Sequence, residues 1–112
     1  MERMTHAEYL ASVRHNAGRV AASVISGTTN LLDGCLALGS LLAQAELDSD
    51  DSDAKAIEFV CSELDGLPLG DFRNRWAPEA LDRLAPELES AIAWATPVAM
   101  PAIQSLARRF GA

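Results

Sequence analysis

The sequence predicts an all-α fold, a single compact bundle of four to six helices that forms one domain over residues 1–112. Three segments repeat apolar residues at steps of three and four, whereas the alternating apolar and polar runs that mark strands are nearly absent. Only 5% of the residues are aromatic, and Ala and Leu dominate, as is typical of helices packed by small side chains. A length of 112 residues suits one core.

The first helix is expected over residues 6–26. Thr5 is a suitable N-cap, because Glu8 follows three residues later as in a capping box. Gly27 fits the end of this helix, since glycine tolerates the left-handed conformation that often follows a last turn. One apolar stripe runs along it: Leu10, Val13, Ala17, Val20 and Val24.

A second helix is expected over residues 29–45. Gly34 and Gly39 each lower its stability by about 1 kcal/mol relative to Ala, so we expect them where another helix approaches closely. The short break at residues 27–28 predicts an antiparallel hairpin of the first two helices. The stripe of the second helix contains Leu31, Cys35, Leu38 and Leu42.

A polar linker, residues 46–53, precedes a third helix that extends to about Leu64. Asp51, Ser52 or Asp53 can cap it, because side-chain oxygens accept hydrogen bonds from the free N–H groups of a first turn. Phe59 points nearly opposite to the apolar face of this helix. That face contains Ala54, Ile57, Val60, Cys61 and Leu64.

Helical spacing resumes at Pro78, which fits a first turn. Pro86 lacks the N–H that a helix interior uses, so we expect a kink or a restart there. Pro97 and Pro101 predict a second interruption before a last helix. The stripe before that interruption is Leu81, Leu84, Leu88 and Ile92, and the last helix carries Ile103, Leu106 and Phe110.

The connection at residues 64–81, LDGLPLGDFRNRWAPEAL, concentrates unusual residues. Pro68 and Gly70 fit a turn in which Pro fixes one dihedral and Gly supplies a positive φ. Trp76 suits a position between helices, and Arg73 can bind a carboxylate at the end of the third helix. These four residues predict an ordered structural corner, and a binding surface is the alternative.

This connection resembles a box of a group of small uncharacterised bacterial all-helical proteins. The box has the form S-E-T-D-x-L-P-x-G-x-x-R-x-x-W-x-x-x-A-L, and the matching residues here are Ser62, Glu63, Asp65, Leu67, Pro68, Gly70, Arg73, Trp76, Ala80 and Leu81. Leu64 stands where the box has Thr. The resemblance covers residues 57–81; it implies an all-helical cytosolic protein and implies no activity.

The charge of the chain is confined to one segment. Residues 46–65 hold eight of the 16 acidic residues against Lys55 alone, so the formal net charge of -7 lies entirely in this segment. Such a concentration can steer a basic partner, although a solvated linker with capping acids would look the same. The candidate partner-binding residues are Asp48, Asp50, Asp51, Asp53, Glu58, Phe59, Glu63 and Asp65.

Motifs for catalysis or metal binding are missing from the sequence. A calcium loop read from Asp48 would need Gly where Asp53 stands and Glu where Phe59 stands. His6 and His15 lie nine residues apart, which is not the i, i+4 spacing of a helical metal pair. We therefore expect no catalytic residue, no metal and no cofactor.

Cys35 and Cys61 lie within apolar helical patterns, which predicts buried, reduced thiols. Pairing Cys61 with a distant His15 as nucleophile and base has no support in a motif. The N-terminus lacks the apolar core of a signal peptide, and no apolar run reaches the roughly 18 residues of a membrane span. We expect a cytoplasmic protein that binds no membrane.

These observations favour a non-catalytic, acidic protein-binding module, for example an immunity protein or inhibitor that neutralises a basic bacterial toxin or effector. A pI of about 4.6 argues against nucleic acid as the partner. Two alternatives remain. One is a self-associating structural helical protein, such as a homodimer, and the other is a sensor that binds a small molecule in a pocket under Trp76.

Overall fold

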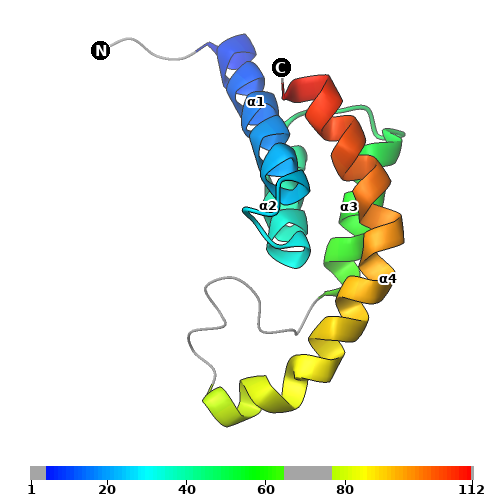
Figure 1. Cartoon of the computed structure of the whole chain (residues 1–112). Helices are drawn as coiled ribbons and strands as arrows, with labels where there is room; N and C mark the ends of the chain where they lie inside the picture. Colours follow the sequence, from blue (N-terminus) through cyan, green and yellow to red (C-terminus); the bar gives the residue numbers. More distant parts are fainter. Residues whose placement is uncertain (1–4, 65–76, 112) are drawn as a thin grey trace.

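Four helices account for most of the chain in the computed structural model, which describes residues 5–64 and 77–111 (Figure 1). They are α1 (His6–Ile25), α2 (Leu31–Gln44), α3 (Ser52–Glu63) and α4 (Pro78–Phe110). No strand occurs within these described ranges. The all-α prediction with four to six helices is confirmed.

The helices alternate in direction, and each packs against the next, while α1 also packs against α4 and closes the bundle (Figure 1). Polar contacts join the start of α1 to the end of α2. Tyr9 Oη donates to Gln44 Oε1 at 2.5 Å, and Arg14 Nε donates to the Ala45 carbonyl at 3.1 Å. The predicted antiparallel hairpin of the first two helices is therefore confirmed.

The helix ends follow local sequence signals. Thr5 Oγ1 accepts a hydrogen bond from Glu8 N at 3.1 Å, which confirms the predicted cap of α1. Gly27 adopts a φ of 85° directly after α1. Asn30 caps α2 by accepting from Asp33 N at 2.8 Å, so α2 begins two residues later than the sequence predicts.

The core lies between the four helices and is built from small and branched apolar side chains. The buried residues of α4 begin at Ala91, and no side chain that the structure describes before it in α4 is buried. Residues of all four helices are completely or almost completely enclosed: Ala17, Ala21, Leu32, Cys35, Leu38, Ile57, Val60, Ala95, Ala99, Ile103 and Leu106.

Two glycines of α2 lie where neighbouring helices come close. A Cβ on Gly34 would overlap the side chain of Val24 in α1, and a Cβ on Gly39 would lie 2.8 Å from Cys61 Sγ in α3. The lower helix propensity of both residues is thus offset by the close approach of α1 and α3. The predicted reason for these glycines is confirmed.

The predicted interruption at Pro97–Pro101 and a restart at Pro86 are wrong, because α4 is one continuous helix of 33 residues. The other outcome expected at Pro86, a kink, stays a prediction. All three prolines are exposed. Each leaves the carbonyl four residues earlier without its helical N–H partner, and that carbonyl lies on the solvent-facing side of α4. Long helices curve around a core with their convex side toward solvent, and α4 curves in this way (Figure 1). A proline on that side is tolerated without ending the helix.

The predicted stripe of α4 is wrong at Ile92, and the side chain of Leu81, which belongs to the same stripe, lies outside the part that the structure describes. Ile92 is 43% exposed, whereas Ala91 and Ala95 on either side of it are buried. The core face therefore continues from Leu88 through alanines, and the larger apolar side chain of Ile92 lies outside it. Small side chains at these positions let α4 lie close to its neighbours.

Five residues of the predicted sites lie outside the described residues: Asp65, Pro68, Gly70, Arg73 and Trp76. Among the described helices, none combines the length and the apolarity needed to cross a membrane.

Candidate functional site

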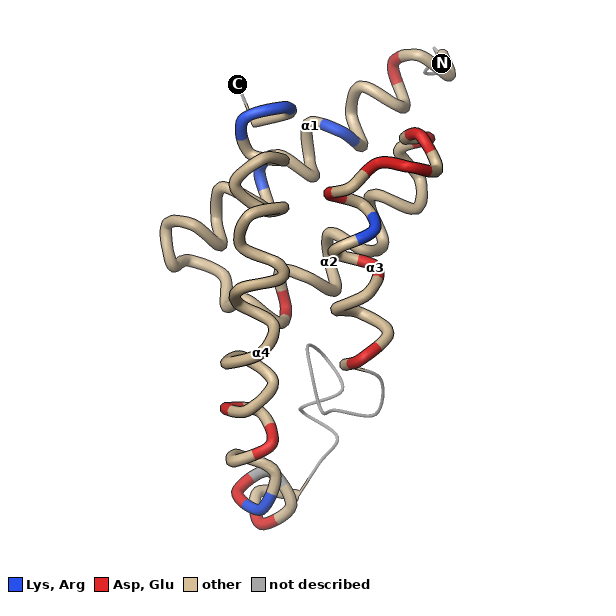
Figure 2. Tube along the Cα trace, turned by 90° about the vertical axis from the view of Figure 1, so that its right-hand side faces the viewer, with Lys and Arg blue, Asp and Glu red and all other residues tan. Residues whose placement is uncertain are grey.

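The acidic residues of the central segment gather on the connection between α2 and α3 and on α3 itself (Figure 2). Asp48, Asp50, Glu58 and Glu63 are exposed. Asp51 and Asp53 are instead only 11% and 15% exposed through their side chains. The predicted acidic surface thus divides into outward carboxylates and enclosed ones.

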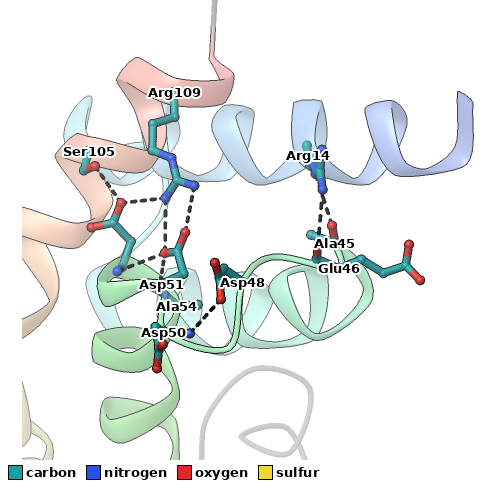
Figure 3. A network of polar contacts seen from close by, with 10 residues as sticks. Arg14, Ala45, Glu46, Asp48, Asp50, Asp51, Ala54, Ser105 and Arg109 are labelled. Atoms are coloured by element: carbon teal, nitrogen blue, oxygen red, sulfur yellow. Dashed lines mark hydrogen bonds and ion pairs between the residues drawn. The ribbon is translucent and has the colours of Figure 1, made fainter. Parts of the chain in front are cut away.

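Asp51 binds Arg109 of α4 (Figure 3), and Asp53 binds the same guanidinium. Arg109 Nη2 donates to Asp51 Oδ2 at 2.8 Å, and Nη1 donates to Asp51 Oδ1 at 3.2 Å and to Asp53 Oδ2 at 2.9 Å. Ser105 Oγ donates to the same Asp53 oxygen at 2.6 Å. We call this group, Asp51, Asp53, Ser105 and Arg109, the α3–α4 clamp.

Asp51 also caps α3, because its Oδ1 accepts from Asp53 N and Ala54 N, each at 3.1 Å. Its carboxylate lies at the positive N-terminal end of α3, and Arg109 lies at the negative C-terminal end of α4. Hydrogen bonds from Arg109 are the main cause that lowers the pKa of Asp51. Since Arg109 already opposes the charge of Asp51 and Asp53, both are poor candidates for contact with a partner.

Arg14 of α1 holds the other end of the α2–α3 connection. Its Nε and Nη2 donate to the carbonyls of Ala45 and Glu46 at 3.1 and 3.4 Å, directly after the last turn of α2 (Figure 3). Glu46 has a φ of 51°, a left-handed conformation that reverses the chain there. The acidic connection is therefore fixed at both ends, by Arg14 and by the α3–α4 clamp.

The outward carboxylates are opposed by only one described cation. Lys55 Nζ lies 3.4 Å from Asp50 Oδ1, and both side chains are largely exposed, so this pair contributes little to stability. Asp48 accepts from Asp50 N at 3.3 Å. Neither Glu58 nor Glu63 forms an ion pair within the part of the chain that the structure describes. We call the four outward carboxylates, Asp48, Asp50, Glu58 and Glu63, the acidic ridge.

Phe59 follows Glu58 on α3 and is 51% exposed. One part of its ring contacts Trp94 of α4, with ring centroids 6.4 Å apart and planes at 77°, an edge-to-face arrangement. Phe59 therefore packs against the C-terminal helix and still presents about half of its surface to solvent. Phe59 is therefore neither fully buried nor free of contacts within the fold.

A pocket of about 360 Å³ lies between α2 and α3. Its lining is mostly apolar and consists of Leu36, Gly39, Ser40, Leu42, Ala43, Ala54, Glu58 and Cys61. This pocket was not predicted from the sequence. Its one available signal was the uncharged outer side of α2, where Leu36, Ser40 and Ala43 follow at helical steps.

Both cysteines are free thiols. Burial, with a smaller contribution from Cys61, raises the pKa of Cys35 to about 12, and burial is also the main cause that raises the pKa of Cys61. Cys61 Sγ donates to the Cys35 carbonyl at 3.1 Å. Since the thiolate is the reactive form, neither sulfur is activated as a nucleophile at neutral pH.

The two histidines are exposed and lie apart from the acidic ridge. His6 Nε2 is 2.7 Å from Glu46 Oε2 in a pair that is open to solvent. No group of three or more His, Cys, Asp or Glu residues is arranged to hold a metal ion in the described ranges 5–64 and 77–111.

Comparisons of the chain with protein-family models, with curated proteins and with solved structures find no match.

Proposed function

We propose that this chain is an acidic protein-binding module without catalytic activity of its own. Its partner is a basic protein, and an immunity protein or inhibitor that neutralises a basic bacterial toxin or effector works in this way. The observation that carries the proposal is the acidic ridge, whose exposed carboxylates stand beside the half-exposed Phe59 on α3. Concentrated surface charge accelerates the encounter with a partner of opposite charge.

The rigid attachment of the α2–α3 connection supports this proposal. Arg14 and Arg109 hold the two ends of the connection, so Asp48 and Asp50 project from a fixed backbone. A preorganised surface loses less conformational entropy when a partner binds. Phe59 supplies an aromatic side chain of the kind that dominates binding energy at many interfaces.

A self-associating structural protein is the second candidate, and the uncharged outer side of α2 favours it. Leu36, Ala37 and Ala43 are exposed there. However, two copies that pair through this region would bring two acidic segments of charge -7 close together. The charge distribution thus favours a basic partner over a second copy.

The test is affinity capture from the native host at low salt. The ridge variant combines Asp48→Asn, Asp50→Asn, Glu58→Gln and Glu63→Gln and leaves the α3–α4 clamp intact. A control variant removes four carboxylates from the exposed first half of α4 through Glu79→Gln, Asp82→Asn, Glu87→Gln and Glu89→Gln. We expect a basic protein to be captured by the wild type and by the control variant, and to be lost with the ridge variant or at high salt. Equal capture by both variants would contradict the proposal.

A further inference from the structure

The pocket between α2 and α3 is a groove lined by successive turns of both helices. Its walls repeat at helical steps, because Leu36, Ser40 and Ala43 line the α2 side while Ala54, Glu58 and Cys61 line the α3 side. Gly39 lets α2 and α3 approach closely at one side of the pocket, since a Cβ there would lie 2.8 Å from Cys61 Sγ. A cavity of about 360 Å³ is near the lower end of the roughly 300–1,000 Å³ typical of ligand pockets.

The groove is apolar on one side and carries a carboxylate on the other. The α2 wall contains no charged residue. On the α3 wall, Glu58 forms no ion pair with any described side chain, and Lys55 is directed to Asp50 at 3.4 Å. The raised pKa of Cys61 leaves that thiol neutral at physiological pH. The complementary ligand is therefore apolar with a positive charge at one edge.

We propose that this groove is the anchor site for a basic amphipathic helix of the partner. An apolar side chain of that helix enters the pocket, and a lysine or arginine one turn away binds Glu58. Grooves between helices bind amphipathic helices through apolar anchors at steps of three and four. This inference rests on the proposed function, and it adds the position of the anchor and the chemistry of the segment that enters it.

A synthetic amphipathic helical peptide of leucine and lysine is the probe, and a leucine and glutamate peptide of the same pattern is its control. Binding is followed through the ¹H–¹⁵N NMR signals of the protein. We expect the leucine–lysine peptide to shift the signals of residues 36–43 and 54–61 and the leucine–glutamate peptide to leave them unchanged. If the basic peptide does not bind, or if its shifts map to another face, the inference is wrong.

Ala43→Leu fills the pocket from an exposed position of α2. It should lower the affinity for the leucine–lysine peptide about tenfold, as expected when an anchor side chain loses its pocket. Ala37→Leu makes the same change at an exposed α2 position outside the pocket lining and should leave the affinity unchanged. Ser40→Leu fills the same pocket and replaces Ala43→Leu if thermal unfolding shows that the latter is not folded. Glu58→Gln should weaken binding more than Glu63→Gln.

Two results distinguish a failure of the proposed anchor site from a failure of the proposed function. If the ridge variant loses the peptide while Ala43→Leu and Ser40→Leu bind it like the wild type, the acidic ridge binds basic partners but the groove is not the anchor site. If Ala43→Leu weakens the peptide while the ridge and control variants capture the host protein equally, the groove binds basic helices and the proposed function of the acidic ridge is wrong.

Discussion

The guanidinium of Arg109 binds both carboxylate oxygens of Asp51, with contacts of 2.8 and 3.2 Å between residues that are 58 positions apart in the chain. The pair joins the last turn of α4 to the first turn of α3. It also separates the acidic residues by role, because Asp51 and Asp53 stabilise the fold while the acidic ridge stays exposed. A partner therefore meets the charge of the acidic ridge, because Arg109 already opposes the charge of Asp51 and Asp53.

Asp51→Ala removes the cap of α3 and the main anion of the α3–α4 clamp. We expect a loss of about 1–3 kcal/mol in the free energy of unfolding, because a cap and a charge-assisted bidentate pair disappear together. Asp51→Asn keeps an oxygen that can cap α3, so its free energy of unfolding should fall less than that of Asp51→Ala. Urea unfolding measures both, with Asp50→Ala as the exposed control. If Asp51→Ala and Asp50→Ala unfold at the same urea concentration, the α3–α4 clamp contributes nothing to the stability of the fold.

The lowered pKa of Asp51 predicts the direction of the pH dependence. Arg109 stabilises the ionised carboxylate in the folded protein, so this contribution is fully present above the ordinary pKa of 3.8 and is lost as the pH falls through the lower pKa of the folded state. Below pH 4 the wild type should lose stability more steeply than Asp51→Asn. Unfolding curves between pH 6 and pH 2 test this, and identical slopes for the two proteins would refute the role of Asp51.

Gly18→Ala should destabilise the contact between α1 and α4. A Cβ at Gly18 would lie 2.5 Å from Gly111 N and would overlap the backbone of Phe110, and backbone atoms cannot rotate away. The gain in helix propensity is about 1 kcal/mol, whereas overpacking costs about 1–3 kcal/mol. The melting temperature should therefore fall, while exposed Asn16→Ala on the same helix leaves it nearly unchanged. If Gly18→Ala melts at a higher temperature than the wild type, α1 and the end of α4 do not approach closely at Gly18.

The cysteines should react slowly with iodoacetamide in the folded protein. At pH 8 both thiols are protonated, since burial raises the pKa of Cys35 to about 12 and also raises that of Cys61. We expect Cys61, which is only half-buried, to react before the buried Cys35. Mass spectrometry of labelled peptides gives both rates, with urea-unfolded protein as the reference. If Cys35 reacts as fast in the folded protein as in the urea-unfolded protein, Cys35 is not buried.

Local signals were sufficient to predict where α1 begins and ends and where α3 begins. The caps at Thr5 and Asp51 and the turn at Gly27 depend on residues within one turn, so they can be read from the sequence. The close approaches at Gly34 and Gly39 were also predictable, because glycine within a helix is unfavourable unless it gains a contact.

The remaining features depend on how distant elements pack. Spacing alone does not show that Arg109 binds Asp51, so the sequence could not separate the carboxylates that Arg109 opposes from those that stay exposed. The pocket exists only because α2 and α3 lie side by side at Gly39. The helix does not restart at Pro86, because an exposed proline can remain in a helix whose core face is held by tertiary contacts elsewhere.

The central claim is that the acidic ridge binds a basic partner, and the association rate constant of the captured protein as a function of ionic strength tests it most directly. With wild type and with the α4 control variant, the rate should fall steeply as salt rises, because charges on the ridge accelerate the encounter. With the ridge variant, the rate at low salt should be lower and its dependence on salt nearly flat. If the ridge variant has the same rate and the same salt dependence as the wild type, the acidic ridge is not the binding surface.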